Sequence, residues 1–167
     1  MTPLFSEILE EVAKAKTKDT KIKLLRKHNS AALRMVLKSS FDPRIEWELP
    51  EGEVPYIPND APAGTEHMLL VHEAKKLYHY IKTGNPKLQQ TRREIMFVQL
   101  LESLHHSEAS LLVAAKNKKL HQLYKGLSTN VVKEAFNWND GFMSNDQPSP
   151  RQPQVRYPQT PGSASGI

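Results

Sequence analysis

The chain has 167 residues, a formal charge of +5 and no cysteine. Its length fits one domain of about 100 to 150 residues followed by a tail. The lack of cysteine excludes a disulfide framework, a thiolate metal site and a cysteine nucleophile, and it suits a reducing, intracellular compartment. No apolar run approaches the roughly 18 residues of a membrane span, and the start of the chain lacks the basic region of a secretion signal. We therefore expect neither secretion nor membrane insertion.

Charge is unevenly distributed along the chain. Residues 11–38 hold nine Lys or Arg against two acidic residues, residues 42–73 hold eight acidic residues against Arg44, and residues 74–140 hold eleven basic against five acidic residues. Two basic blocks thus flank an acidic one. This distribution is more typical of a protein that binds a polyanion than of a surface on which basic residues are scattered at random.

Three short helices are predicted before residue 42. Thr2 and Pro3 read as an N-cap and first helical position, and the apolar spacing that follows extends to about Ala15. Thr17 and Ser30 are the cap candidates of the second and third helices. The five prolines between residues 42 and 64 exclude a helix there, which leaves a connector that is either ordered or flexible.

Four more helices are predicted after the connector. The fourth spans Thr65–Thr83, with apolar residues that include Tyr78, and ends at Gly84 in a left-handed C′ position. A capping box of Thr91 and Glu94 starts the fifth.

In the fifth helix, the apolar stripe runs through Ile95, Val98, Leu101 and Leu104, which turns Val98 inward and leaves Phe97 near an edge. Ser107 and Ser128 cap two shorter helices. No stretch alternates with the period of a strand. The predicted fold is therefore all-α: a compact bundle of about seven short helices with a long Pro-rich connector. It comprises a helical domain at residues 1–140 and a Pro/Gln/Ser-rich disordered tail at residues 141–167.

Catalytic and metal-binding patterns are not found. Metal ligands on one helical face need spacings of three or four residues, whereas His67, His72 and His79 are five and seven apart, and His105 and His106 are adjacent. No nucleophile motif and no glycine-rich phosphate loop occur. We expect no enzyme activity, no metal and no cofactor.

The two basic blocks are the candidate binding residues. The density of lysine in the first block exceeds what solubility needs and lacks interspersed Glu, so contact with phosphates is the preferred interpretation. The second block lies in a loop between helices, where lysines and the amides of a helix N-terminus could bind phosphate, although an ordinary solvated turn explains it equally well. The candidate residues are Lys16, Lys18, Lys21, Lys23, Arg26, Lys27, Lys116, Lys118, Lys119, Lys125, Gly126 and Ser128.

The order of these predicted helices and basic segments resembles that of a known domain. The opening LFSEILEEVAKAKTKDTKIKLLRKHNSAALRMVLKSSFDP and the closing LESLHHSEASLLVAAKNKKLHQLYKGLSTNVVKEAF resemble the two ends of the N-terminal DNA-binding domain of T-even-type ATP-dependent DNA ligases. The likeness covers about residues 4 to 138 and is weakest through the connector. The stretches PNDAPAG and YKGLSTNVVKEAF are also similar to an uncharacterised protein family of marine T-even-like bacteriophages of the cyanophage type.

The resemblance implies an all-α domain that grips duplex DNA, nicked duplex included, through its sugar-phosphate backbone and without reading sequence. The adenylation motif Lys-x-Asp-Gly is absent, so ligation itself is not expected. A phage-encoded protein would act in the host cytoplasm or be associated with the virion.

Two functions remain open at this point. The first is sequence-independent, non-catalytic binding of double-stranded DNA. The alternative is a virion component or a protein-protein adaptor of a replication or transcription complex, whose tail binds another phage or host protein. A DNA-binding protein should gather both basic blocks on one face, whereas an adaptor should expose an apolar patch.

Overall fold

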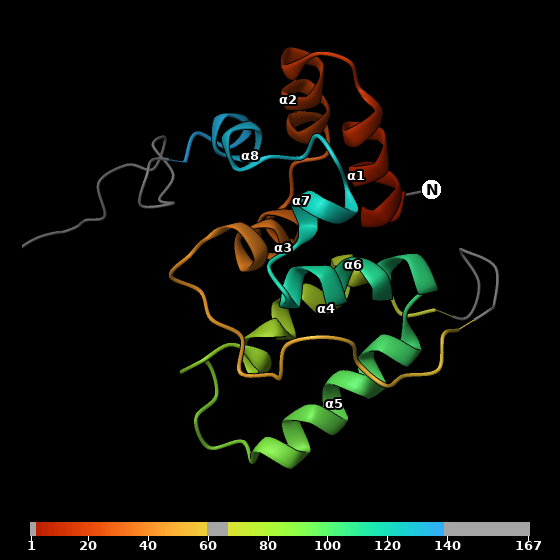
Figure 1. Ribbon diagram of the computed structural model, residues 1–167, viewed down its shortest axis with the longest axis vertical. Coiled ribbons are helices and arrows are strands. Elements are labelled where there is room, and N and C mark those ends of the chain that lie inside the picture. The colour runs from red at the N-terminus through yellow and green to blue at the C-terminus, as the bar shows by residue number, and fades with distance from the viewer. Residues whose placement is uncertain (1–2, 60–66, 139–167) are drawn as a thin grey trace, which may run out of the picture. The chain divides into compact units, whose positions relative to one another are not determined.

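The computed structural model describes residues 3–59 and 67–138, and their regular structure is helical (Figure 1). The chain divides into two units, residues 1–135 and 136–167, and only residues 136–138 of the second are described. Within the described ranges there is no strand, only isolated bridges such as that between Trp47 and Ile81. The all-α prediction is confirmed. The tail predicted after residue 140 lies outside the described residues.

The described residues form eight α-helices and one 3₁₀ helix. About seven were predicted; the fourth predicted helix is split in two, and a single turn, α7, occupies part of the predicted basic loop. The helices are α1 (Phe5–Lys14), α2 (Lys18–Lys27), α3 (Ala31–Phe41), α4 (Leu70–Glu73), the 3₁₀ helix η1 (Ala74–Tyr80), α5 (Gln90–Ser103), α6 (His106–Lys116), α7 (Leu120–Leu123) and α8 (Thr129–Ala135).

Three of the predicted N-caps are confirmed. The hydroxyls of Thr17, Ser30 and Ser128 accept hydrogen bonds from backbone amides three residues later, at 3.2, 3.1 and 3.3 Å. Each interaction is local, so the sequence around the cap is sufficient to specify it.

The predicted starts of α5 and α6 are not found in the structure. The cap of α6 is His105, whose Nδ1 accepts from the amide of Ser107 at 3.1 Å, so the prediction of Ser107 as cap is wrong. The start of α5 is at Gln90, after Gln89, and the predicted capping box of Thr91 does not form. Thr2 lies outside the described residues.

The predicted fourth helix is a short α-helix followed by a 3₁₀ helix. It starts at Leu70 and ends at Tyr80, and the described residues 67–69 and 81–83 are not helical, so the predicted span Thr65–Thr83 is too long. In η1 the buried residues are Ala74, Leu77 and Tyr80, each three residues from the next, which is the period of a 3₁₀ helix. Tyr78, which the sequence grouped with the apolar face, is therefore 51% exposed.

The left-handed residue after η1 is Thr83, with φ 67°, and not Gly84 as predicted. Gly84 is needed for a different reason. A Cβ at this position would lie 2.1 Å from the carbonyl oxygen of Tyr78, so only glycine can approach that backbone closely enough.

The first half of the connector is ordered and packed. Trp47 is buried, and its indole Nε1 donates to the carbonyl of Ser39 at 2.9 Å. The amide of Glu48 donates to the carbonyl of Tyr80 at 2.7 Å, and the amide of Lys82 donates to the carbonyl of Glu46 at 2.8 Å. These bonds attach the connector to η1 and to the loop that follows it.

The helices of the first unit are arranged in tiers in Figure 1. Helices α1, α2 and α8 lie above α3, α6 and α7, and α5 lies below them. The α1–α2 pair packs against α6 and α8, and α3 packs against α6 and η1. Leucines that are fully buried fill the spaces between these helices: Leu9, Leu25, Leu33, Leu37, Leu70, Leu101, Leu104, Leu111, Leu112, Leu120 and Leu127.

The register predicted for α5 is partly wrong. Leu101 is fully buried as expected, but Ile95 is 45% exposed, whereas Phe97 is 1% exposed. The ring of Phe97 meets those of Trp47 and Tyr80, with centroids 6.2 and 5.1 Å away. The aromatic neighbours of Phe97 thus come from the connector and η1, and the local pattern of the helix cannot show where these lie.

Candidate nucleic-acid interface

The basic residues of the first block divide between two sides of α2. One set faces α8 and the turn before it: Lys18 Nζ pairs with Glu134 Oε1 at 2.6 Å, and Lys21 Nζ donates to the carbonyl of Gly126 at 3.1 Å. Arg26 donates from Nε and Nη2 to the carbonyls of Ala135 and Glu134, both at 2.9 Å. These three cations are therefore used within the protein.

Arg26 acts as a cap on the C-terminus of α8. The last carbonyls of a helix have no intrahelical partner and carry partial negative charge, so a guanidinium that bonds two of them is favourable. The same bonds fix the position of α2 on α8. Arg26 is a structural residue in this arrangement.

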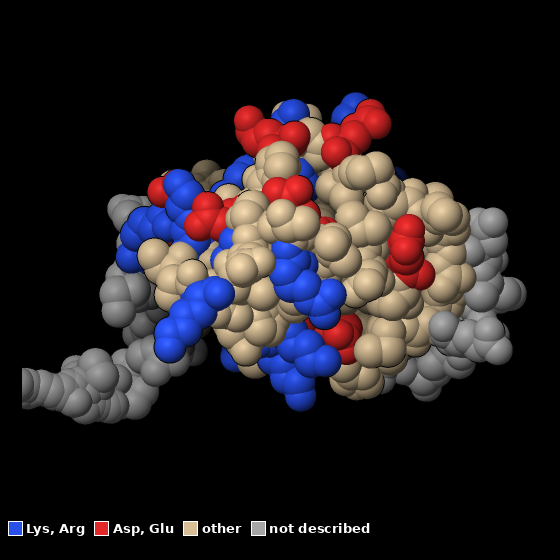
Figure 2. Space-filling view, turned by 90° about the horizontal axis from the view of Figure 1, so that it is seen from below, with Lys and Arg blue, Asp and Glu red and all other residues tan. Residues whose placement is uncertain are grey.

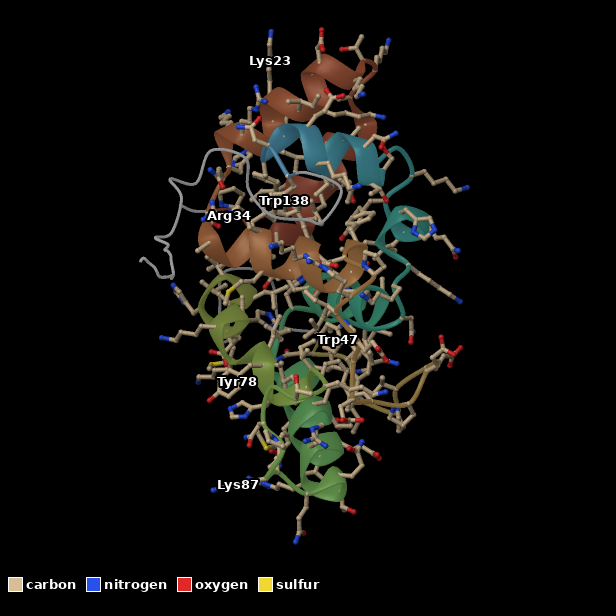
Figure 3. All side chains as sticks on the ribbon, turned by 90° about the vertical axis from the view of Figure 1, so that its left-hand side faces the viewer. Lys23, Arg34, Trp47, Tyr78, Lys87 and Trp138 are labelled. Atoms are coloured by element: carbon tan, nitrogen blue, oxygen red, sulfur yellow. The ribbon has the colours of Figure 1, made fainter. Side chains whose placement is uncertain are left out.

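The second set faces solvent. Lys23 and Lys27 are exposed and four residues apart, which places them on one face of α2. Lys16, just before the helix, is also exposed. Figure 3 shows Lys23 pointing away from the body of the protein at the α2 end. None of the ion pairs found in the described ranges involves these three lysines.

Two lysines of the second block turn toward the connector. Lys116 is 4% exposed, and its Nζ donates to the carbonyls of Pro50 and Gly52 at 2.6 and 3.0 Å and to Asn117 Oδ1 at 2.7 Å. Lys118 donates to the carbonyl of Asp42 at 2.7 Å. Burial lowers the pKa of both amines. Neither amine is placed to contact a phosphate.

Of the remaining candidates, two are exposed lysines and two have structural roles near α8. Lys119 and Lys125 are exposed. Gly126 has φ 97°, and its carbonyl accepts a hydrogen bond from Lys21, so it shapes the turn before α8. The hydroxyl of Ser128 is used as the cap of α8. The structure thus joins Lys21 of the first block to the turn next to Lys125, while Lys116 and Lys118 face the connector.

A basic segment that the sequence analysis did not select lies at residues 74–93. It holds six Lys or Arg and no Asp or Glu, and Tyr78 is exposed in it. The absence of acidic residues was the signal that could have identified it. On the face viewed from below, toward which α5 lies, both basic and acidic side chains are present (Figure 2).

Three histidines, His67, His105 and His106, form ring contacts with one another. The rings of His67 and His105 have centroids 5.2 Å apart, and those of His105 and His106 are 4.3 Å apart. Burial and then the two neighbouring histidines lower the pKa of His105. No group of three potential metal ligands occurs in the part of the chain that the structure describes.

These features define an all-α protein whose surface lysines are divided between internal bonds and solvent. Residues 8–122 match a family described as "Family of unknown function (DUF6433)", and the chain belongs to this family. No curated protein and no solved structure matches the chain. Within the described residues, no helix combines the length and apolar character needed to cross a membrane.

Proposed function

We propose that this protein binds double-stranded DNA through its sugar-phosphate backbone, without reading sequence and without catalysis. The observation that carries the proposal is the solvent-facing side of α2, where Lys23 and Lys27 are exposed and in no ion pair of the described residues, together with exposed Lys16 just before the helix. The bacteriophage origin and the site of action in the host cytoplasm, implied by the resemblance, belong to the same proposal.

The internal bonds of α2 support this role indirectly. Lys18, Lys21 and Arg26 anchor the helix to α8 and to the turn before it, so Lys23 and Lys27 project from a helix with a fixed position. Cations held on a rigid helix lose less conformational entropy on binding than cations on a loop. The resemblance to a ligase DNA-binding domain implies the same mode of contact.

The number of available lysines predicts a modest dependence of DNA affinity on salt. Each neutralised phosphate releases condensed counterions, so log K against log salt has a slope of about −0.9 per contact, and two or three contacts give about −2 to −3. The Lys23→Gln/Lys27→Gln variant should lose about two of these contacts and bind all duplex sequences more weakly. Fluorescence anisotropy with intact and nicked duplexes over a series of salt concentrations measures the slope.

A matched control removes two lysines that are already paired. Lys14 binds Glu10 at 3.1 Å and Lys76 binds Glu73 at 3.6 Å, so Lys14→Gln/Lys76→Gln removes the same net charge but should change the slope little. If wild-type protein binds no duplex below about 100 μM at about 50 mM salt, or if the two double variants behave alike, this face of α2 is not a DNA site.

An adaptor function is the second candidate, and a groove beside the connector favours it. The groove has a volume of about 500 Å³ and lies between residues 53–56 and helices α6 and α7. Val54, Tyr56, Val113 and Leu123 line it, and Leu123 is 46% exposed. Loss of partner binding on Leu123→Glu, with DNA binding absent in wild-type protein, would favour the adaptor over the DNA-binding protein.

A further inference from the structure

The segment Ala74–Arg93 holds six Lys or Arg, no Asp or Glu, and one exposed aromatic ring, that of Tyr78. Two of its lysines are neutralised by ion pairs, Lys76 with Glu73 at 3.6 Å and Lys82 with Glu46 at 3.1 Å. The other exposed cations, Lys75, Lys87 and Arg92, are in no ion pair of the described residues. Arg92 also acts electrostatically on Tyr80, which places it near η1.

The 3₁₀ geometry of η1 aligns Lys75 with Tyr78. Side chains three residues apart eclipse one another in a 3₁₀ helix, so the buried row of Ala74, Leu77 and Tyr80 leaves Lys75 and Tyr78 in a second, exposed row. The ring of Tyr78 also stacks against that of His79, with centroids 4.1 Å apart. In Figure 3, Tyr78 and Lys87 follow Arg34 down one side of the molecule.

The loop that supports Tyr78 is held in place by Arg93. This buried guanidinium donates to the carbonyls of His79, Asn85 and Leu88 at 2.8, 3.0 and 3.2 Å. Asn85 Nδ2 bonds His79 Nδ1 at 3.0 Å, which fixes the ring that Tyr78 stacks on.

Backbone geometry at the end of η1 adds a second constraint on Tyr78. Thr83 has a left-handed φ of 67°, a conformation that costs energy for a β-branched residue. Gly84 packs directly on the Tyr78 carbonyl. The protein thus holds a strained turn that fixes the backbone under an exposed ring.

From this arrangement we propose that η1 and the loop after it bind single-stranded nucleic acid. An unpaired base stacks on Tyr78, while Lys75, Lys87 and Arg92 contact the neighbouring phosphates. Aromatic rings in a basic surrounding are typical of surfaces that bind single strands, because every base offers a π face once it is unpaired. Paired bases stack on each other and leave no face for Tyr78, so this surface selects single strands over duplex. The proposal is independent of duplex binding by α2.

The experiment compares a labelled single strand of about 16 nucleotides with an abasic strand of the same length and with the corresponding duplex, in about 50 mM salt. Tyr78→Ala should weaken binding of the single strand at least about fivefold, the lower limit for loss of one stacked base. It should leave binding of the abasic strand and of the duplex unchanged. Tyr78→Phe keeps the ring and should bind as wild type does.

Charge variants within the same segment complete the test. Lys75→Gln/Lys87→Gln should weaken binding of both the normal and the abasic strand, whereas Lys76→Gln/Lys82→Gln, which removes two ion-paired lysines, should have a smaller effect. Circular dichroism checks that each variant is folded. The proposal is overturned if wild type binds no single strand below about 100 μM. It is also overturned if Tyr78→Ala binds the single strand as wild type does, or if it weakens all three ligands equally.

Discussion

Glu108 joins the start of three helices with one buried carboxylate. It lies in the first turn of α6, and its two oxygens accept from the amides of Phe5 at 2.9 Å and Leu70 at 3.0 Å, the first residues of α1 and α4. Negative charge is favourable at a helix N-terminus. Burial nevertheless raises the pKa of Glu108 above its ordinary value, because it outweighs the two amide bonds. No local pattern reveals this role, since its partners are 103 and 38 residues away.

Removing this carboxylate should destabilise the fold. Glu108→Ala leaves two buried amides without an acceptor and should cost about 2 to 5 kcal/mol in the free energy of unfolding, measured with urea. Glu7→Ala is the control, because Glu7 is exposed and, among the described residues, accepts a hydrogen bond from the amide of Leu4 alone; it should cost less than about 1 kcal/mol. Equal effects of the two changes would contradict a special role of Glu108.

The raised pKa also predicts a dependence on pH. The folded state binds the Glu108 proton more tightly than the unfolded state, so the stability of wild type relative to Glu108→Gln should increase as the pH falls from above the folded pKa toward the ordinary value of 4.5. Urea unfolding of both proteins across this range measures the difference. A relative stability that decreases over the same range would mean that the amides lower the pKa instead.

At the scale of the element, α5 shows how neighbours select the buried face of a helix. Its buried residues are Arg93, Phe97 and Leu101, each four residues from the next. An alternative stripe through Ile95 and Val98 has similar apolar content, so composition alone does not decide between them. The rings of Trp47 and Tyr80 lie beside Phe97 and decide the register.

Two truncations distinguish these registers. Phe97→Ala should cost about 3 to 5 kcal/mol because it opens a cavity between two aromatic rings, and Leu101→Ala about 2 to 5 kcal/mol. Ile95→Ala should cost less than about 1 kcal/mol because the side chain is half exposed. Denaturant unfolding gives all three values. A larger cost for Ile95→Ala than for Phe97→Ala would support the register predicted from sequence.

At the scale of the whole molecule, polar side chains at the end of α6 hold the connector to the helices. Lys116 bonds two connector carbonyls, and Asn117 Oδ1 accepts from the amide of Gly52 at 3.0 Å. Asp42, at the start of the connector, is 2% exposed and bonds both the amide and the guanidinium of Arg44. Burial opposes ionisation of Asp42, but these bonds lower its pKa overall.

A change at Lys116 separates this structural role from phosphate binding. Lys116→Met keeps the aliphatic stem but removes the amine that bonds the Pro50 carbonyl, and it leaves the Gly52 carbonyl with Asn117 Nδ2 as its donor, at 3.1 Å. Stability should therefore fall by about 1 to 3 kcal/mol. Hydrogen exchange at the amide of Gly52 should become faster, while DNA affinity should be unchanged. Lys119→Met, at an exposed lysine nearby, should leave both exchange and stability unchanged. A loss of DNA affinity with no loss of stability would instead indicate that Lys116 contacts DNA.

For the candidate DNA site, the sequence could predict the basic segment but not which of its side chains face solvent. The density of lysine before residue 28 is a property of the sequence, and most of this first block lies in α2. Which of those lysines face solvent depends on where α8 packs. Because α8 is about one hundred residues away in the chain, Lys18, Lys21 and Arg26 could not be distinguished from Lys23 and Lys27 beforehand.

Local interactions along the chain were enough to predict part of this fold. Hydroxyl caps at Thr17, Ser30 and Ser128, prolines that exclude helix from the connector, and the absence of strand patterns were sufficient to predict an all-α fold. The tertiary structure alone decided the burial of Phe97, the 3₁₀ geometry that exposes Tyr78 and the internal role of Lys116. Each of these depends on a partner from a distant segment, and the energy gained by packing against that partner exceeds the small preferences that local sequence expresses.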